Sequence, residues 1–166
     1  MELVGALSLI AATLTTGLMA GLFTSFAYAV MPALRRADDR TLVVTMQQIN
    51  RAIINGWFLS GFLGAPALAI VALATHLSGD LRRALPWIAA GLLLYLVMFG
   101  ITMGLNVPLN NQLEAAGDPD QHTDLATVRD RFEARWVAYN LVRAVASTAA
   151  FGCLLWALVL HGTATG

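Results

Sequence analysis

Strong hydrogen-bonding side chains stand inside or beside four membrane-length apolar stretches of this chain. The stretches are Leu3–Val30, Trp57–Ala74, Leu85–Leu105 and Val142–Leu160. A helix of about 20 apolar residues is long enough to cross a bilayer. Polar groups within lipid are costly, so they usually face the interior of a bundle and have a function there. The pattern predicts a helical membrane protein with a polar interior.

Composition agrees with this prediction. Hydrophobic residues make up 58% of the 166 residues and charged residues 12%, about half the charged share of a soluble domain. The mean hydropathy is +0.68. We therefore predict one all-α domain over residues 1–166, an integral membrane four-helix bundle with spans at about 3–30, 53–75, 85–107 and 137–160.

Charge and cysteine content exclude several classes of protein. All ten basic residues are arginines, they are scattered along the chain, and ten acidic residues balance them. Nucleic-acid binding is therefore not expected. Cys153 is the single cysteine, which excludes a disulfide framework or a cysteine-based metal site. His76 and His161 are expected at helix ends near water, and no metal ligand set is predicted.

The arginines also indicate an orientation in the membrane. Most of them fall in the connections at about 35–52 and 108–136. The positive-inside rule places both connections in the cytoplasm and both termini outside, in the inner (plasma) membrane. A bundle this small leaves much lipid-facing surface, which is compatible with a homo-oligomer.

Helical patterning continues beyond two of the spans. From Thr41 the pattern runs through Asn55 into the second span, which predicts one unbroken helix. Thr123-Asp124 is a suitable cap for a helix that runs unbroken into the fourth span. Helices two and four are thus expected to extend beyond the bilayer on the same side. Pro108 is expected to end helix three.

Each predicted helix carries one small or polar stripe that a bundle would turn inward. On helix two the spacing of i, i+4 and i+8 places three polar side chains on one face. Helices three and four show similar three- and four-residue intervals. The candidate residues are Gln47, Arg51 and Asn55, then Asn106 and Asn110, then Arg135, Trp136, Asn140 and Arg143.

These residue types favour binding of an anion or a carbonyl group. An inward-facing Arg143 beside amides and an indole would hold a developing oxyanion, whereas an outward-facing one would reach the headgroups. Amides suit the orientation of a phenol or ketone. A general base is missing from the predicted core, so Glu133 and Asp130 at the cytoplasmic entrance are the expected proton acceptors.

The same residues carry a resemblance to a known family. The chain resembles the anthrone oxygenase-like membrane proteins in Met46–Asn50, Phe62–Pro66, Asn106–Asn110 and the Trp136-x3-Asn140-x2-Arg143 pattern. The likeness extends over about residues 10–160. It implies a monooxygenase that uses no metal, flavin or haem and oxidises an anthrone-like or other phenolic polycyclic compound with dioxygen.

The resemblance also implies roles for the candidate residues. Arg143 and Arg51 would stabilise the enolate oxygen, and Trp136 would stack on the ring. Hydroxyl and carbonyl groups of the substrate would be oriented by Asn140, Asn106 and Asn110. Substrate binding would further involve Gln47, Asn55 and Arg135.

Two other interpretations remain open at this point. The polar residues fit a non-catalytic membrane protein that binds or transports a lipid or a quinone-like molecule. They also fit a purely structural role as hydrogen bonds between helices, each worth about 0.6–2 kcal/mol.

Overall fold

The computed structural model describes residues 2–121 and 124–165, and every regular element in this part of the chain is helical. Four helices are long and apolar enough to cross a membrane: Glu2–Leu34, Gly56–Thr75, Asp80–Ala115 and Leu125–Ala164. The prediction of an all-α membrane bundle is confirmed. At the start of the fourth helix, Asp124 accepts a hydrogen bond from Thr127 N at 3.0 Å. Thr123, the other half of the expected cap, lies outside the described residues.

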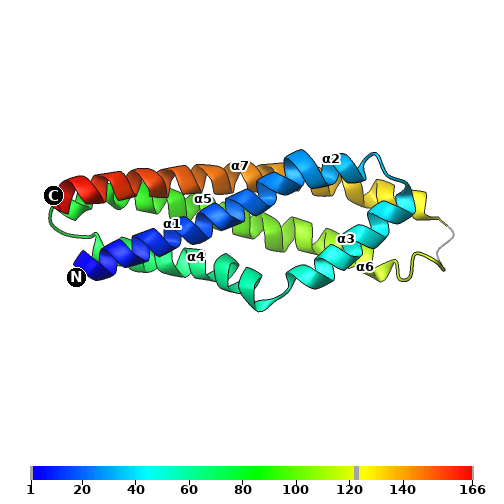
Figure 1. Cartoon of the computed structure of the whole chain (residues 1–166), viewed down its shortest axis with the longest axis horizontal. Coiled ribbons are helices and arrows are strands. Elements are labelled where there is room, and N and C mark those ends of the chain that lie inside the picture. The colour runs from blue at the N-terminus through cyan, green and yellow to red at the C-terminus, as the bar shows by residue number, and fades with distance from the viewer. Residues whose placement is uncertain (1, 122–123, 166) are drawn as a thin grey trace.

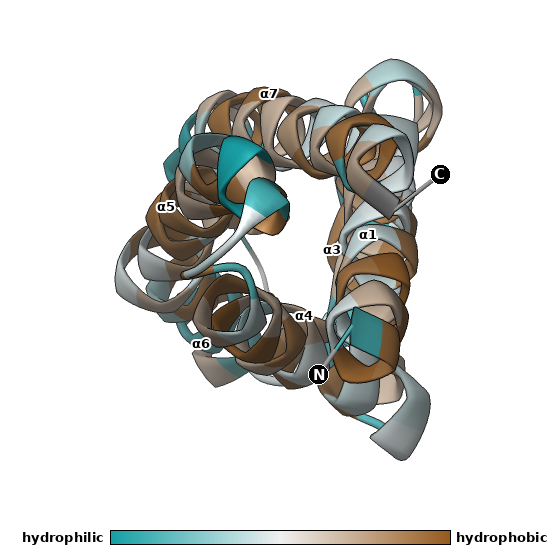
Figure 2. Cartoon of the chain, turned by 90° about the vertical axis from the view of Figure 1, so that its left-hand side faces the viewer, coloured by the Kyte–Doolittle hydropathy of each residue, from teal (hydrophilic) through white to brown (hydrophobic). Residues whose placement is uncertain are grey.

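Four elements form the bundle: α1 (Glu2–Ser25), α4 (Gly56–Thr75), α5 (Leu85–Ile101) and α7 (Leu125–Thr165). Helix α1 contacts α4, α4 contacts α5, α5 contacts α7, and α7 contacts α1, so the helices form a ring around one axis (Figure 2). Both ends of the chain lie at one end of the bundle (Figure 1). The connections that carry most arginines lie at the other end, together with α3 (Asp39–Ile53) and α6 (Val107–Ala115).

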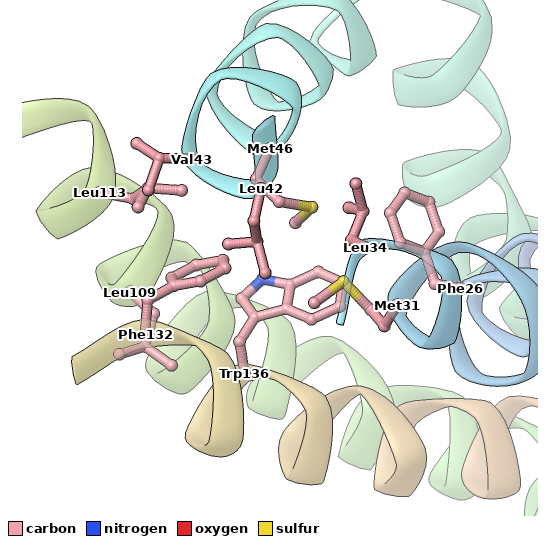
Figure 3. Packing of buried hydrophobic residues seen from close by; sticks show 10 residues of the cluster. All are labelled: Phe26, Met31, Leu34, Leu42, Val43, Met46, Leu109, Leu113, Phe132 and Trp136. Atoms are coloured by element: carbon pink, nitrogen blue, oxygen red, sulfur yellow. The ribbon is translucent and has the colours of Figure 1, made fainter. Parts of the chain in front are cut away.

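The hydrophobic core consists of three clusters of buried side chains. One cluster joins α1, α4, α5 and α7 around Leu9, Ala72 and Leu154. A second contains Phe23, Phe62 and Tyr95. The third packs α3 against α6 and α7 (Figure 3) and consists of Phe26, Met31, Leu34, Leu42, Val43, Met46, Leu109, Leu113, Phe132 and Trp136.

The second span differs from its prediction, because the expected unbroken helix is broken at Ile54 and Asn55. The backbone of Asn55 is extended (φ −133°, ψ 169°), and its side chain accepts a hydrogen bond from Phe58 N at 3.1 Å. The same side chain donates from Nδ2 to Ala52 O at 2.8 Å. Asparagine is a strong N-cap, so Asn55 ends the path of α3 and begins α4 in a new direction.

Helix three also differs from its prediction, because Pro108 does not end it. The chain passes from α5 through a π-helical turn, η3 (Thr102–Asn106), directly into α6. Pro108 lies in the first turn of α6, where the absence of its N–H is tolerated. The extra residue of a π turn rotates the faces that follow by about 100°. Helix α6 therefore presents to α3 a face that a regular helix would turn elsewhere.

The two histidines expected near water are instead buried against each other. His76 is 0% exposed and His161 is 9% exposed. Nε2 of His76 lies 2.9 Å from Nδ1 of His161, and Nδ1 of His76 lies 2.7 Å from Ala72 O. This pair joins the end of α4 to the end of α7, at the end of the bundle that carries both termini.

Gln47 joins α3 to the end of α6. Its Nε2 donates to Leu113 O at 2.9 Å and to Gly117 O at 3.0 Å. The side chain is buried in the interface between the two helices.

We predict that Gln47→Leu destabilises the protein, because it removes the donor to the buried oxygen of Leu113, at a cost of about 1–3 kcal/mol, and to the partly buried oxygen of Gly117. The temperature of thermal unfolding in detergent should fall. Gln48→Leu is the matched control, because Gln48 is exposed on the next position of the same helix. Equal unfolding temperatures for the two variants would show that the Gln47 bonds contribute nothing.

We predict that acid destabilises the fold through His76, which lies one residue beyond α4. Burial lowers the pKa of His76 below its usual value, and the neighbouring His161 acts in the same direction. The unfolded chain therefore binds this proton more readily than the folded protein. The stabilisation is complete above a pH of about 6.5 and is lost as the pH falls below it. The unfolding temperature should fall between pH 7 and 5.5, and His76→Phe should weaken that dependence; an unchanged dependence would contradict this account.

Candidate functional site

A cavity of about 460 Å³ lies between α1, α3, α4, α6 and α7, in the half of the bundle away from the termini. Its volume is within the range of small-molecule sites, about 300–1,000 Å³. Most of its wall is apolar, and a few polar side chains converge on it. The polar lining residues are Asn50, Arg51, Thr102, Asn110, Asn111, Glu114, Trp136 and Arg143.

Arg143 is the buried cation of this cavity. It lies on α7 within an apolar helix, and only 5% of it is exposed. Its guanidinium carbon lies 4.5 Å from the ring centroid of Phe23 and 5.2 Å from that of Trp136. Nη2 donates to Asn140 Oδ1 at 2.8 Å, and Asn140 Nδ2 donates to Phe23 O at 3.0 Å. Two rings and one amide thus hold the guanidinium in place at the cavity wall.

The charge of Arg143 is not balanced by a neighbouring acid. It forms no ion pair with any carboxylate of residues 2–121 and 124–165. Its Nε is buried and has no hydrogen-bond acceptor among the same residues. A buried donor without an acceptor is costly, and a cation at low dielectric attracts an anion strongly. The described part of the chain therefore leaves one buried donor of Arg143 without an acceptor, and the guanidinium places a positive charge without a paired acid beside the cavity.

Aromatic rings line the same cavity. Phe58 and Phe62 of α4 stack with centroids 5.2 Å apart, and Phe62 stacks on Phe99 at 4.9 Å. Phe58, Phe62, Phe23 and Trp136 are cavity-lining residues, whereas Phe99 lies behind Phe62. Flat rings on several sides provide favourable contact for a planar polycyclic molecule.

Trp136 is held in place by hydrogen bonds to two amide side chains, one on η3 and one on α6. Its Nε1 donates to Asn110 Oδ1 at 2.7 Å, and its backbone oxygen accepts from Asn106 Nδ2 at 3.2 Å. Figure 3 shows its indole between Met31 and Leu42, pointing from α7 toward α3. Asn106 itself is fully buried and is not a lining residue of the cavity, and its Oδ1 has no donor among the described residues.

The other candidate residues have different positions. Arg51 lies at the exposed rim of the cavity, where its Nε donates to Glu114 Oε1 at 2.8 Å. Gln47 bonds α6, and Asn55 caps α4; neither lines the cavity. Arg135 is exposed and bonds Arg131 O on its own helix. The structure thus brings together Arg143, Asn140, Trp136 and Asn110, and places Arg51 at the rim.

The carboxylates expected at the entrance belong to a different surface. Glu133 and Asp130 line a groove of about 770 Å³ between α7 and residues 27–36, not the cavity that contains Arg143. Glu133 Oε2 accepts from Arg129 Nε at 2.6 Å. The expectation that either serves this cavity is wrong, because the face of α7 that carries them turns toward Met31 and Pro32 instead.

The structure adds lining residues that sequence reasoning missed. Glu114 lies on α6 opposite Arg51, Phe23 lies on α1 over Arg143, and Asn50 lies on α3 with a buried Nδ2 that has no acceptor among the described residues. The signal for Glu114 was present, because opposite charges in two connections on one side of the membrane are expected to pair. Phe23 has no such signal among the many apolar residues of α1.

A comparison with families of known proteins supports the same region. A sequence profile of the family described as anthrone oxygenase matches residues 55–153. The match covers α4, α5, α6 and most of α7, including Trp136, Asn140 and Arg143. Comparisons with curated proteins and with solved structures gave no match. Because the profile matches more than half of the chain, this integral membrane protein belongs to the anthrone oxygenase family.

Proposed function

We propose that the protein is a cofactor-independent monooxygenase that oxidises an anthrone-like or other phenolic polycyclic substrate with dioxygen inside the cavity. The observation that carries this proposal is the buried Arg143, whose Nε has no acceptor among the described residues and whose charge no acid of those residues balances. Family membership supports an oxygenase, and the aromatic walls support a planar substrate.

The chemistry begins with the substrate as an anion. Loss of a proton from the carbon opposite the carbonyl group gives an enolate, and its negative charge lies partly on oxygen. The positive charge of the Arg143 guanidinium, which lines the cavity, stabilises that oxygen, so the cavity binds the anion more tightly than the neutral ketone. Preorganised donors of this kind typically contribute about 10²–10³ in rate.

The enolate then reacts directly with dioxygen. It transfers one electron, and the resulting radical pair combines into a carbon–oxygen bond. The first proton returns to the peroxide anion to give a hydroperoxide. Loss of the second proton from the same carbon then cleaves the O–O bond, leaves a new carbonyl group on the substrate and releases hydroxide, which takes up that proton to form water. One oxygen atom enters the product and one leaves as water, so the substrate supplies both electrons needed to reduce the second atom.

The surrounding residues bind and orient the substrate in this proposal. Asn140 holds the guanidinium, and Asn110 holds the indole of Trp136 against the cavity. Phe23 covers the guanidinium, which keeps water away from the charge. Substrate enters as a membrane-soluble molecule, since the rim at Ile54 and Leu59 is apolar and exposed.

We predict that Arg143→Met lowers oxygen uptake with anthrone as substrate by about 10²-fold or more, because the enolate loses its counter-charge. Arg143→Lys should retain part of the rate, since the charge remains but the planar donor is lost. Oxygen uptake is measured with an electrode on purified protein in detergent, with spontaneous oxidation in empty micelles subtracted.

The matched control is Arg131→Met, an exposed arginine on the same helix that does not line this cavity. It should oxidise anthrone at the rate of the unmodified protein. Saturable binding of anthrone without oxygen uptake by the unmodified protein would instead support a binding or transport role. Equal oxygen uptake by Arg143→Met and the unmodified protein would refute the role of Arg143.

A further inference from the structure

A carboxylate lies at the mouth of the cavity. Among the described lining residues, Glu114 is the one acidic side chain. It projects from α6, and 43% of its side chain is exposed, whereas Arg143 on the inner wall is 5% exposed. The other polar lining groups are amides, a hydroxyl, an indole and guanidinium groups, which do not take up a proton near neutral pH.

Arg51 fixes the orientation of this carboxylate. Nε and Nη2 of Arg51 both donate to the same oxygen, Oε1 of Glu114, at 2.8 and 2.5 Å. Oε2 receives no hydrogen bond from any residue in the described ranges. One oxygen is thus held by the arginine and the other remains available to accept a proton. The bond also links α3 to α6 across the rim of the cavity.

We propose that Glu114 is the proton acceptor of the oxidation and that Arg51 is its positioning residue. This inference rests on the proposed function. The proton acceptor then lies at the rim of the cavity, and not at Glu133 or Asp130, where the sequence analysis expected it. Arg143 and Glu114 then act at two ends of one cavity, the first on the enolate oxygen and the second on the C–H bond.

The proton balance of the reaction closes with this assignment. Oε2 of Glu114 takes the first proton from the substrate carbon, and the electron pair of the C–H bond remains on the substrate as the enolate. After dioxygen adds, the protonated carboxyl group of Glu114 gives its proton to the terminal oxygen of the peroxide anion. The ionised Oε2 then takes the second proton from the same carbon while the O–O bond breaks, and hydroxide departs. The hydroxide takes that proton from Glu114 to form water, and the carboxylate returns to its ionised form.

The test separates proton removal from oxidation. Anthrone deuterated at the methylene carbon is incubated with the protein in detergent without oxygen, and loss of deuterium to the solvent is followed by mass spectrometry. We expect the unmodified protein to exchange deuterium faster than empty micelles. Glu114→Gln should slow this exchange by about 10²-fold or more, because the amide cannot accept a proton. Its KM for anthrone should change little, since Gln keeps an oxygen that Arg51 can bond.

Arg51 is tested by the same exchange assay. Arg51→Gln should lower the exchange rate and kcat with a small effect on KM, and Arg51→Lys should restore part of the rate. Recovery by lysine distinguishes positioning of the carboxylate from a general loss of structure. Thermal unfolding of each variant shows separately whether the fold is retained.

The matched control is Asp120→Asn. Asp120 lies in the loop after α6 and accepts a hydrogen bond of 2.7 Å from Arg40, which is on α3 like Arg51. Both side chains are exposed, and neither lines the cavity. Its exchange rate should equal that of the unmodified protein. Unchanged exchange in Glu114→Gln, with oxygen uptake intact, would overturn the inference and leave the proposed function standing. An unmodified protein that neither exchanges deuterium nor consumes oxygen would overturn both.

Discussion

The site depends on one buried charge, Arg143, that no acid of the described residues neutralises. Arg143 lies on a membrane-spanning helix, in contact with two aromatic rings and one amide, and no carboxylate of the described residues pairs with it. Keeping such a charge out of water has a large desolvation cost. A purely structural role does not offset that cost, because an apolar side chain would fill the space at least as well. In the proposed function, a ligand with negative charge offsets this cost.

Much of the local structure serves to present this charge to the cavity. Asn140 bonds the guanidinium and also the backbone of α1, so α1 and α7 share the site. The π turn η3 rotates α6 so that Asn110 reaches Trp136 and Glu114 reaches Arg51. The break at Asn55 separates α3 from α4 and leaves an apolar rim between them. Gln47 and Asn106 form hydrogen bonds between helices, as the interpretation of the polar residues as purely structural expects.

The architecture was predictable because apolar length and composition alone determine which segments can cross a membrane. Polar residues in apolar helices also predicted that Arg143, Asn140 and Trp136 lie together, and the structure places Arg143 in contact with the other two. Helical periodicity did not predict the direction of the chain where a capping side chain or an irregular turn determines it. Asn55 continues a helical pattern but caps a helix, and Pro108 should end one but follows a π turn. Glu133 and Asp130 line a different groove for the same reason, since the faces of α6 and α7 depend on turns that the sequence pattern does not reveal.

The central claim is that the cavity binds its ligand as an anion beside Arg143. The most direct measurement follows the ionisation of a hydroxyanthraquinone, bound to the protein, by its visible absorption across pH. Burial alone raises the pKa of a phenol, whereas a cation within about 4–6 Å lowers it by about 1–3 units. The account predicts that the bound phenol ionises at a lower pH than in empty micelles. Ionisation at the same or a higher pH would contradict it.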